Sequence, residues 1–495
     1  MVKNNYCFWF VTGSQNLYGP SVLEEVHNNS KAIVEHFNNN MQSEYKIICK
    51  DTVKTKEEIY KLAKEANYDE SCAGIITWMH TFSPSKMWIN GLKELNKPVL
   101  HLHTQFNKEI PWDKIDMNFM NTNQSAHGDR EHGFIHTRMH TGRKVVVGYY
   151  ENPSVLKEIG KWLRVAVAAS LSKHIKVARF GDNMRSVAVT EGDKVEAEIK
   201  FGWSVDYFGL GDLVAYVDGV DEDSINKLFK EYQEKYIISK ETLDDSEKVD
   251  SIRYQLRLEI GIQSFLDEKG YSCYTNTFED LHGLDQLPGL ASQSLMSKGY
   301  GFGPEGDWKV AAMTRIMKIM SSNQGTSLME DYTYHLEDGN ETILGAHMLE
   351  ICPTLAKEKP TIEVHPLGIG GKNPPARMVF DSKTGPAVCA SLVDMGGRFR
   401  LIILDVEAIE LPHKMPNLPV ARVLWTPKPN LEVAAKAWIY AGGAHHTVFS
   451  YNVDADDLID FAKMMDIEYI HINENTNIYA LEKELMFNDL LWKLK

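Results

Sequence analysis

A chain of 495 residues is long enough for about three domains, each able to bury its own core. Hydrophobic residues make up 43% and charged residues 24%, and the net charge of −15 argues against nucleic acid or an anionic membrane as a partner. The apolar run at the N-terminus is too short for a signal peptide, and no run approaches the roughly 20 apolar residues of a membrane span.

The first third of the chain, residues 1–175, alternates short apolar runs with helical patterns. Strands are expected at 7–12, 46–49, 73–78 and 98–103, with helices at 22–37, 56–65 and 86–95 between them. This alternation predicts a Rossmann-like α/β domain, in which a parallel sheet is covered by helices on both faces. The loop over 12–20 would leave the carboxyl end of the first strand, where open α/β sheets bind ligands.

The middle third, residues 176–325, follows a long helix expected over 154–173 and repeats the same alternation. Strands are expected at 175–180, 186–190, 204–208 and 271–278, and helices at 195–201, 224–234 and 248–269. A second Rossmann-like parallel-sheet domain is therefore predicted.

The last third, residues 326–495, changes character. After Gly339, β-branched and alternating segments punctuated by Gly and Pro dominate, and helical patterns return at 431–440, 456–465 and 480–491. This part is predicted to be a β-rich domain, antiparallel or barrel-like, with terminal helices.

Two carboxylates and two imidazoles between residues 305 and 446 are candidate metal ligands, and most of them lie in glycine-containing segments. They are Glu305, Glu330, His347 and His446. Such a mixed oxygen and nitrogen shell suits Mn, Co or Mg better than a structural zinc, because no Cys takes part. An octahedral ion held by these four residues would keep two positions open for adjacent oxygens of a polyol.

Each of these residues also has an ordinary structural explanation. An acid in the first turn of a helix, as Glu305 is expected to be, complements the helix dipole. A single His in a strand-like run, such as His347, is more often a hydrogen-bonded core residue than a ligand. His445 and His446 would point to opposite faces of a strand, so at most one is expected to reach a metal.

A second histidine series, His132, His136 and His140, would align on one face of a helix. It has the spacing of a zinc site, but a solvated helix face is the better explanation. No role is assigned to these three residues.

The motifs as a set resemble the L-arabinose isomerase family. The resemblance begins at Phe8-Trp-Phe-Val-Thr-Gly-Ser14-Gln15-Asn16-Leu17-Tyr18-Gly19. It continues through Asn123-Gln124-Ser-Ala-His127-Gly128, the Phe302-Gly-Pro-Glu305 and Glu330 segments and the run 361–372, and ends at His445-His446-Thr447. It therefore covers nearly the whole chain.

The resemblance implies a metal-dependent aldose–ketose isomerase that converts L-arabinose to L-ribulose, and D-galactose to D-tagatose, in arabinose catabolism. It makes Glu305 and Glu330 the catalytic acid/base pair and, with His347 and His446, the ligands of one divalent metal per subunit, preferably Mn²⁺, with Co²⁺ or Mg²⁺ as alternatives. It also implies a cytoplasmic hexamer, a dimer of trimers, whose sugar pockets are shared between subunits. The residues implied in sugar binding are Gln15, Leu17, Tyr18, Phe82, Gln124, His127, Met184, Phe278, Ile369 and His445.

Several alternatives stay open at this level. Core packing explains Phe82 and Met184 equally well. A metal-mediated hydride shift competes with proton transfer through an enediol, and the carboxylate that takes the C2 proton is undecided. A fucose-type isomerase of the same fold is the second functional hypothesis, and a non-catalytic sugar-binding protein is the third.

Six scattered cysteines without a Cys-x-x-Cys pair indicate reduced thiols, as expected in the cytoplasm.

Overall fold

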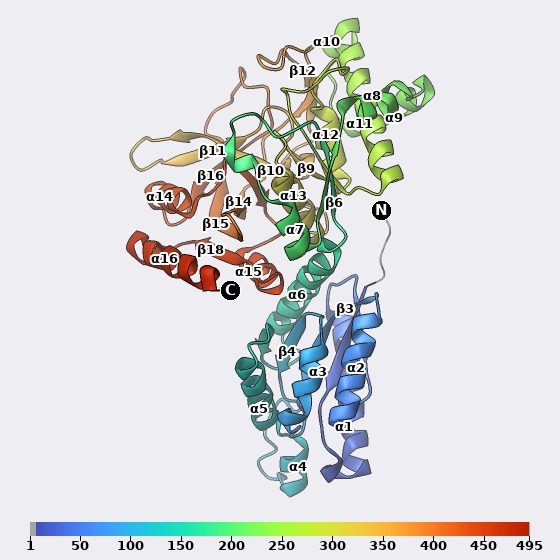
Figure 1. Cartoon of the computed structure of the whole chain (residues 1–495), viewed down its shortest axis with the longest axis vertical. Helices are drawn as coiled ribbons and strands as arrows, with labels where there is room; N and C mark the ends of the chain where they lie inside the picture. The colour runs from blue at the N-terminus through green and yellow to red at the C-terminus, as the bar shows by residue number, and fades with distance from the viewer. Residues whose placement is uncertain (1–5, 495) are drawn as a thin grey trace. The chain divides into compact units, whose positions relative to one another are not determined.

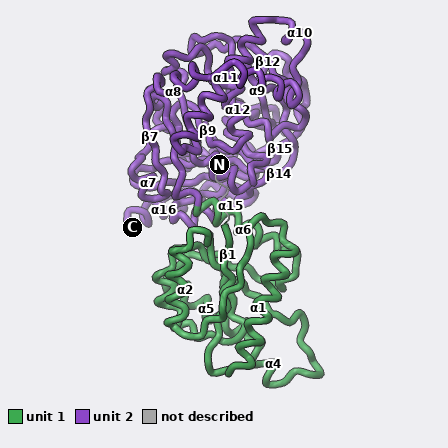
Figure 2. The backbone as a smooth tube through the Cα atoms, turned by 90° about the vertical axis from the view of Figure 1, so that its right-hand side faces the viewer, with its two compact units in different colours: residues 1–170 green, residues 171–495 purple. Residues whose placement is uncertain are grey.

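The computed structural model describes residues 6–494, which fall into two compact units divided after Ser170. Figure 2 shows the two units in different colours. Within the described residues, no helix is long and apolar enough to cross a membrane.

The first unit is built on a parallel sheet in the order β2-β1-β3-β4-β5 (Figure 1). The bounds of its strands are Cys7–Thr12 for β1, Lys46–Cys49 for β2, Cys72–Trp78 for β3, Val99–His103 for β4 and Lys144–Val147 for β5. Strands β1 and β3 are buried along their whole length, as expected for central strands of a sheet covered on both faces. The covering helices are α1 (Pro20–Asn40), α2 (Lys56–Tyr68), α3 (Ile89–Glu94), α4 (Met117–Thr122), α5 (Ser125–Arg138) and α6 (Pro153–Ser172). The predicted parallel α/β fold is confirmed.

The second unit begins with another parallel sheet, in the order β7-β6-β8-β9. Its strands are β6 (Lys176–Phe180), β7 (Ser204–Phe208), β8 (Cys273–Asn276) and β9 (Gly301–Gly303). The surrounding helices are α7 (Lys194–Phe201), α8 (Leu210–Asp218), α9 (Glu222–Lys235), α10 (Lys240–Leu243), α11 (Ser246–Lys269), α12 (Leu290–Ser297) and α13 (Trp308–Met320).

One expected strand of this sheet is wrong. The segment 186–190 is a loop that ends in a 3-10 turn over Ala188–Thr190. Ser186 has φ of 66°, a left-handed conformation that an extended strand does not contain, so the short apolar run after it cannot join the ladder.

The rest of the second unit is an antiparallel barrel. Strands β14, β17, β10, β11, β16 and β15 pair in that order, and pairing between β14 and β15 closes the ring. Their bounds are Thr326–His335 for β10, Thr342–Ala346 for β11, Gly385–Asp394 for β14, Phe399–Ile409 for β15, Arg422–Pro427 for β16 and His446–Ser450 for β17. Strand β18 (Glu468–Ile472) adds to β15 in parallel, and β12 (Thr361–Val364) pairs with β13 (Ala376–Val379) apart from the barrel. The helices after the barrel strands are α14 (Leu431–Ala441), α15 (Ala455–Met464) and α16 (Ile478–Leu494). The predicted barrel-like, β-rich part is confirmed.

Helix α13 connects the two architectures inside this unit. It is buried along nearly its whole length and contacts β6, β8 and β9 of the parallel sheet as well as β10, β14 and β17 of the barrel. One hydrophobic cluster joins α11 residues such as Ile252 and Leu256 to barrel residues such as Val423 and Phe449. The expected central and C-terminal domains therefore share a core.

The histidine series on α5 is not a solvated face, so that expectation is wrong for two of its three members. His132 and His136 are fully buried, with their Nε2 atoms 3.1 Å apart, whereas His140 lies beyond the end of the helix and is exposed. Asp129 on the same helix accepts from His101 and His103 of β4, at 2.9 and 2.8 Å. The face packs onto the sheet, so these polar side chains pair with one another in the interior, while His101 Nδ1 and His132 Nδ1 are buried without a hydrogen-bond partner among the described residues.

This burial makes a pH-dependent contribution to stability. Burial, with the nearby positive charge of Arg143, lowers the pKa of His136 to about 3, and burial likewise lowers the pKa of His132 well below its usual value. The unfolded chain takes up protons near pH 6.5 whereas the folded chain does not, so stability falls as the pH drops from about 6.5 toward 3.

We expect His136→Gln to flatten that dependence. The variant loses one titrating group, worth up to about 1.4 kcal/mol per pH unit in this range, although the lost contact to Thr141 lowers its stability at pH 7. Unfolding midpoints measured from pH 7 to pH 4 would show a shallower decline than in the wild type. Parallel curves for the two proteins would contradict this account.

Candidate active site

Three of the predicted ligands come from adjacent strands of the barrel. Strand β10 pairs with β17 so that Glu330 lies directly opposite His446, and on its other side Glu330 lies opposite Ala346, the last residue of β11. His347 follows immediately, and its Nε2 is 4.0 Å from Glu330 Oε2. Strand register therefore brings together residues that are up to 116 positions apart in the chain, from 330 to 446.

The fourth predicted ligand, Glu305, is held by a tight loop between β9 and α13. Its φ of 59° is a left-handed conformation that costs energy for a residue with a side chain, so the surroundings must impose it. Gly306 donates to the carbonyl of Asn276 at 3.1 Å, and the Met184 N–H donates to the carbonyl of Glu305 at 3.0 Å. A Cβ at Gly306 would lie 2.5 Å from the Asn183 backbone, so only glycine fits there. The loops that follow β6 and β8 thus fix the Glu305 backbone at the carboxyl end of the parallel sheet.

Glu305 meets the barrel at its two adjacent histidines. Its Oε2 lies 3.6 Å from His445 Nε2 and 3.9 Å from His446 Nε2, and the ligand atoms of the three residues all lie within 4.8 Å of one another. His445 precedes β17, which starts at His446, so the alternation of a strand does not send the two rings to opposite sides. Both rings therefore come near Glu305, and the expectation that at most one of them reaches a metal stays a prediction.

His446 has the clearest need for a cation. It is fully buried, and neither ring nitrogen has a hydrogen-bond partner among the described residues. Its Nδ1 faces Asp307 Oδ2 at 3.7 Å, while Nε2 faces Glu305. A buried polar atom without a partner is costly, and a divalent ion at Nε2 would supply the missing interaction. The donor set present therefore fits a metal.

The electrostatic surroundings of Glu305 and His446 favour the protonation states in which these side chains bind metals. Burial alone would raise the pKa of Glu305, but the contact with His445 and the nearby charge of His446 hold that pKa below its usual value. Burial lowers the pKa of His446, whereas the Glu305 carboxylate raises the pKa of His445. An ionised carboxylate beside a neutral buried imidazole is what a divalent cation requires.

Glu350 is a further member of the site that the sequence reasoning missed. Its Oε2 is 2.5 Å from His347 Nδ1 and also accepts from the Leu349 N–H at 3.0 Å. Burial would lower the pKa of His347, but the Glu350 carboxylate outweighs it and raises that pKa. The contact fixes the ring so that Nε2 points to Glu330, a role typical of carboxylates behind metal-binding histidines. In the sequence, only the position of Glu350, three residues after His347, indicated that the two side chains could meet.

Three of the expected sugar-binding residues lie in this unit. Met184 is tied through its backbone to Glu305. Phe278 follows β8. The loop that contains Ile369 runs beside Phe278, as shown by the adjacent Gly370, where a Cβ would be 3.7 Å from the Phe278 Cβ.

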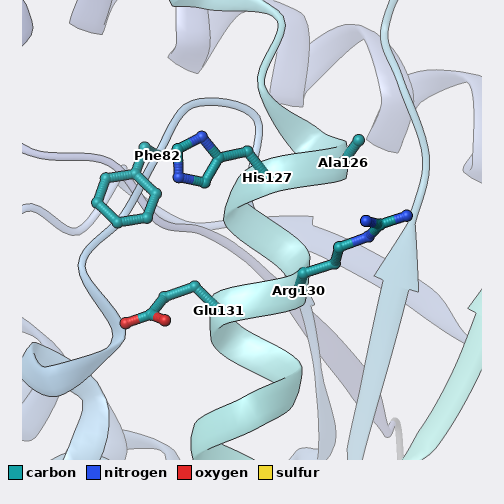
Figure 3. Close-up of a pocket in the computed structure, with 5 residues that line it drawn as sticks. All are labelled: Phe82, Ala126, His127, Arg130 and Glu131. Carbon is teal, nitrogen blue, oxygen red and sulfur yellow. The ribbon is translucent and has the colours of Figure 1, made fainter.

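The remaining expected sugar-binding residues form a separate group in the first unit. The rings of Phe82 and His127 lie 4.5 Å apart and, with Ala126, Arg130 and Glu131, line an open hollow of about 710 Å³ (Figure 3). Tyr18 donates to Gln124 Oε1 at 3.4 Å. Gln15 and Leu17 belong to the same turn as Tyr18, and the Leu17 side chain is 83% exposed.

One carboxylate and one unpaired buried imidazole from the barrel strands, with a second carboxylate from the loop before α13, define a candidate centre for a divalent cation in this α/β fold. Comparison with known proteins narrows this class. The models of the L-arabinose isomerase N-terminal, central and C-terminal domains match residues 2–174, 176–323 and 325–468. The chain belongs to the L-arabinose isomerase family, whose members are aldose–ketose isomerases.

Individual relatives agree with the domain matches. The chain is 58% identical to the L-arabinose isomerase of Geobacillus stearothermophilus, over 99% of this chain and 98% of the relative. It is 59% identical to that of Clostridium beijerinckii and 56% identical to that of Bacillus subtilis, over 99% of both chains in each case. A glucose-galactose binding protein from Geobacillus stearothermophilus covers 64% of this chain and 92% of its own, with 14% identity and a TM-score of 0.15, a likeness too low to support any conclusion.

We expect His446→Asn to weaken Mn²⁺ binding by at least tenfold. The substitution removes the only fully buried imidazole near Glu305 among the described residues, and asparagine does not reach the same point. Isothermal titration of the chelator-treated protein with Mn²⁺ gives the affinity independently of turnover. His471→Asn is the matched control, because His471 lies on β18 and contacts Asp405. Equal affinities in the two variants would remove His446 from the metal centre.

Proposed function

We propose that this protein converts L-arabinose to L-ribulose, with one divalent cation held by Glu305, Glu330, His347 and His446. The observation that carries the proposal is the approach of the Glu305 carboxylate to the unpaired ring of His446, which lies opposite Glu330 in the strand ladder, in a chain that belongs to this family over nearly its whole length. Family membership and the relatives' names support L-arabinose as the substrate.

The bound cation would polarise the sugar carbonyl and stabilise negative charge that develops on its oxygens. A shell of carboxylate oxygens and imidazole nitrogens without thiolate favours Mn²⁺, with Co²⁺ or Mg²⁺ as alternatives. Glu350 holds the His347 ring in place, and Asp307 faces the far side of the His446 ring.

The isomerisation removes a proton from C2, adds one to C1, and moves a hydroxyl proton from O2 to O1. One carboxylate of the pair Glu305 and Glu330 accepts the proton from C2, and the other manages the protons on the oxygens or at C1. His445 is 40% exposed beside Glu305 and is placed to contact a sugar hydroxyl. Met184, Phe278 and Ile369 form the pocket wall in the same unit. The same chemistry would convert D-galactose to D-tagatose.

Six of the expected sugar-binding residues lie in the first unit, whereas the four proposed metal ligands all lie in the second. The six are Gln15, Leu17, Tyr18, Phe82, Gln124 and His127. We propose that they complete the pocket of a neighbouring subunit in a hexamer, a dimer of trimers. The open hollow at Phe82 and His127 supports a surface that faces a partner. A cytoplasmic location is consistent with six cysteines that are all free.

A mixing experiment tests the shared pocket. His127→Ala and Glu305→Gln chains, each inactive alone, are combined under conditions that exchange subunits. Activity should return when pockets are shared, because some sites then contain both native residues. Activity that stays at the level of the separate variants, despite proven exchange, would show that each chain carries its whole site.

The substrate assignment is tested by measuring ketose formation from L-arabinose, L-fucose and D-galactose, before and after treatment with a chelator. We expect the highest kcat/KM with L-arabinose, loss of activity after chelation and recovery on addition of Mn²⁺. Preference for L-fucose would instead identify a fucose-type isomerase. Binding of sugar without turnover would identify a sugar-binding protein. Full activity of a verified metal-free protein would refute the requirement for a divalent cation.

The acid/base roles are tested by Glu305→Gln and Glu330→Gln. Glutamine is nearly isosteric but cannot accept a proton, so each variant should lose turnover by about 10²-fold or more while remaining folded. Glu341→Gln, at an exposed position just before β11, is the control and should keep normal turnover. A near-normal kcat in either test variant would exclude that carboxylate from the proton transfer.

A further inference from the structure

The turn that carries Glu305 contacts a buried asparagine that has no role so far. Residues 304–307, called the Glu305 turn below, join β9 to α13. Asn183 lies against this turn, in the loop after β6, and is only 5% exposed. A Cβ at Gly306 would be 2.5 Å from the Asn183 Cα, so the two backbones are in direct contact.

The side-chain amide of Asn183 makes three hydrogen bonds. Its Nδ2 donates to the carbonyl of Gly306 at 3.2 Å and to the carbonyl of Thr190 at 2.6 Å. Its Oδ1 accepts from Arg179 Nη1 at 2.5 Å. Both amide hydrogens and the amide oxygen are therefore in use, and a carboxylate of the same shape could not make the two donations.

Arg179 sets the orientation of this amide. It belongs to β6, which lies between β7 and β8 in the sheet, and it is 8% exposed. Its Nη1 is also 3.1 Å from Asp182 Oδ1, whereas its Nε has no hydrogen-bond partner among the described residues. A hydrogen bond from a guanidinium is stronger than one between neutral groups, so the Asn183 oxygen is held on the side of Arg179. The amide nitrogen is thereby directed at the Glu305 turn.

The Glu305 turn needs support because its backbone is strained. Glu305 has φ of 59°, which a residue with a side chain keeps only where its surroundings impose it. Among the described residues, the carbonyl of Gly306 accepts from the Trp308 N–H at 2.8 Å and from Asn183. The Trp308 bond lies within the same short segment, so Asn183 is the contact that ties this carbonyl to another part of the fold.

The same amide also connects the Glu305 turn to the start of α13. The carbonyl of Thr190 accepts from Asn183 and, at 2.9 Å, from Lys309 Nζ. Lys309 Nζ in turn lies 3.2 Å from Asp307 Oδ1, and both of these side chains are buried. Two successive residues of the turn, Gly306 and Asp307, are therefore linked to the loop after β6 through buried polar groups.

We propose that Asn183 is a positioning residue for Glu305: its amide, oriented by Arg179, holds the Glu305 turn in the conformation that brings the carboxylate to His446. The hold on the turn is a property of the fold, and its consequence for a bound cation rests on the proposed function. Substitution of groups that orient metal ligands from behind typically lowers metal affinity or activity by about 10- to 100-fold.

Hydrogen exchange tests the hold on the turn without any metal. Asn183→Asp removes both amide donors but keeps the size of the side chain and the acceptor for Arg179, so this variant should fold. We expect peptides that span 303–308 to exchange about tenfold faster in Asn183→Asp and in Asn183→Ala than in the wild type, because a lost hydrogen bond favours local opening by roughly that factor. Unchanged exchange of this segment in both variants would overturn the proposal.

Gln255→Ala is the matched control for the loss of a buried amide. Gln255 is fully buried, and its amide also makes three hydrogen bonds, with Gln286, Leu287 and Ala291. None of these contacts involves the Glu305 turn, so exchange at 303–308 should stay at the wild-type rate. Equal acceleration in this control would indicate a general loosening of the unit and would count against a specific role of Asn183.

Metal affinity tests whether the hold acts through Glu305. In isothermal titration, Asn183→Asp should bind Mn²⁺ about tenfold more weakly than the wild type. The added negative charge would by itself attract the cation, so a weaker affinity reports lost positioning. The loss should largely disappear in a Glu305→Gln background, because the two residues then act on the same ligand. An equal loss in both backgrounds, or unchanged affinity of Asn183→Asp, would refute positioning through Glu305.

The two measurements separate this inference from the proposed function. A wild type that does not bind Mn²⁺, or Glu305→Gln with the affinity of the wild type, would refute the metal centre. The exchange rates at 303–308 would still decide whether Asn183 holds the Glu305 turn, because they require neither metal nor sugar.

Discussion

The burial of helix α13 is the constraint on which the site depends. This helix lies between the parallel sheet and the barrel of the second unit, and its buried lysines bind backbone carbonyls on both sides. Lys309 Nζ donates to the carbonyls of Thr190 and Glu191 at 2.9 and 2.7 Å, and Lys318 Nζ donates to the carbonyl of Thr326 at 2.9 Å. A buried ammonium without acceptors is costly, so these contacts fix the helix to the loop after β6 and to the start of β10.

This constraint places Glu305 against the barrel. Glu305, three residues before the helix, adopts a strained backbone conformation that persists because hydrogen bonds on both sides hold it. The ladder between β10 and β17 independently sets Glu330 opposite His446. Two separate parts of the fold therefore set Glu305 Oε2 3.9 Å from the buried imidazole of His446 and pair Glu330 with His446 in the strand ladder. Groups that are fixed before the reaction provide the preorganisation that catalysis of proton transfer needs.

The sequence by itself determined the fold class, because the alternation of apolar runs and helical patterns in the first two thirds and the β-rich pattern of the last third are local signals. It also singled out Glu305, Glu330, His347 and His446, since their motifs are long and specific. Only the tertiary structure decided what depends on packing across long separations. It buried His132 and His136 by placing α5 on a sheet, made 186–190 a loop, brought His445 beside Glu305 and put Glu350 behind His347. Burial and partners are set by what folds against a residue, and a local pattern does not contain that information.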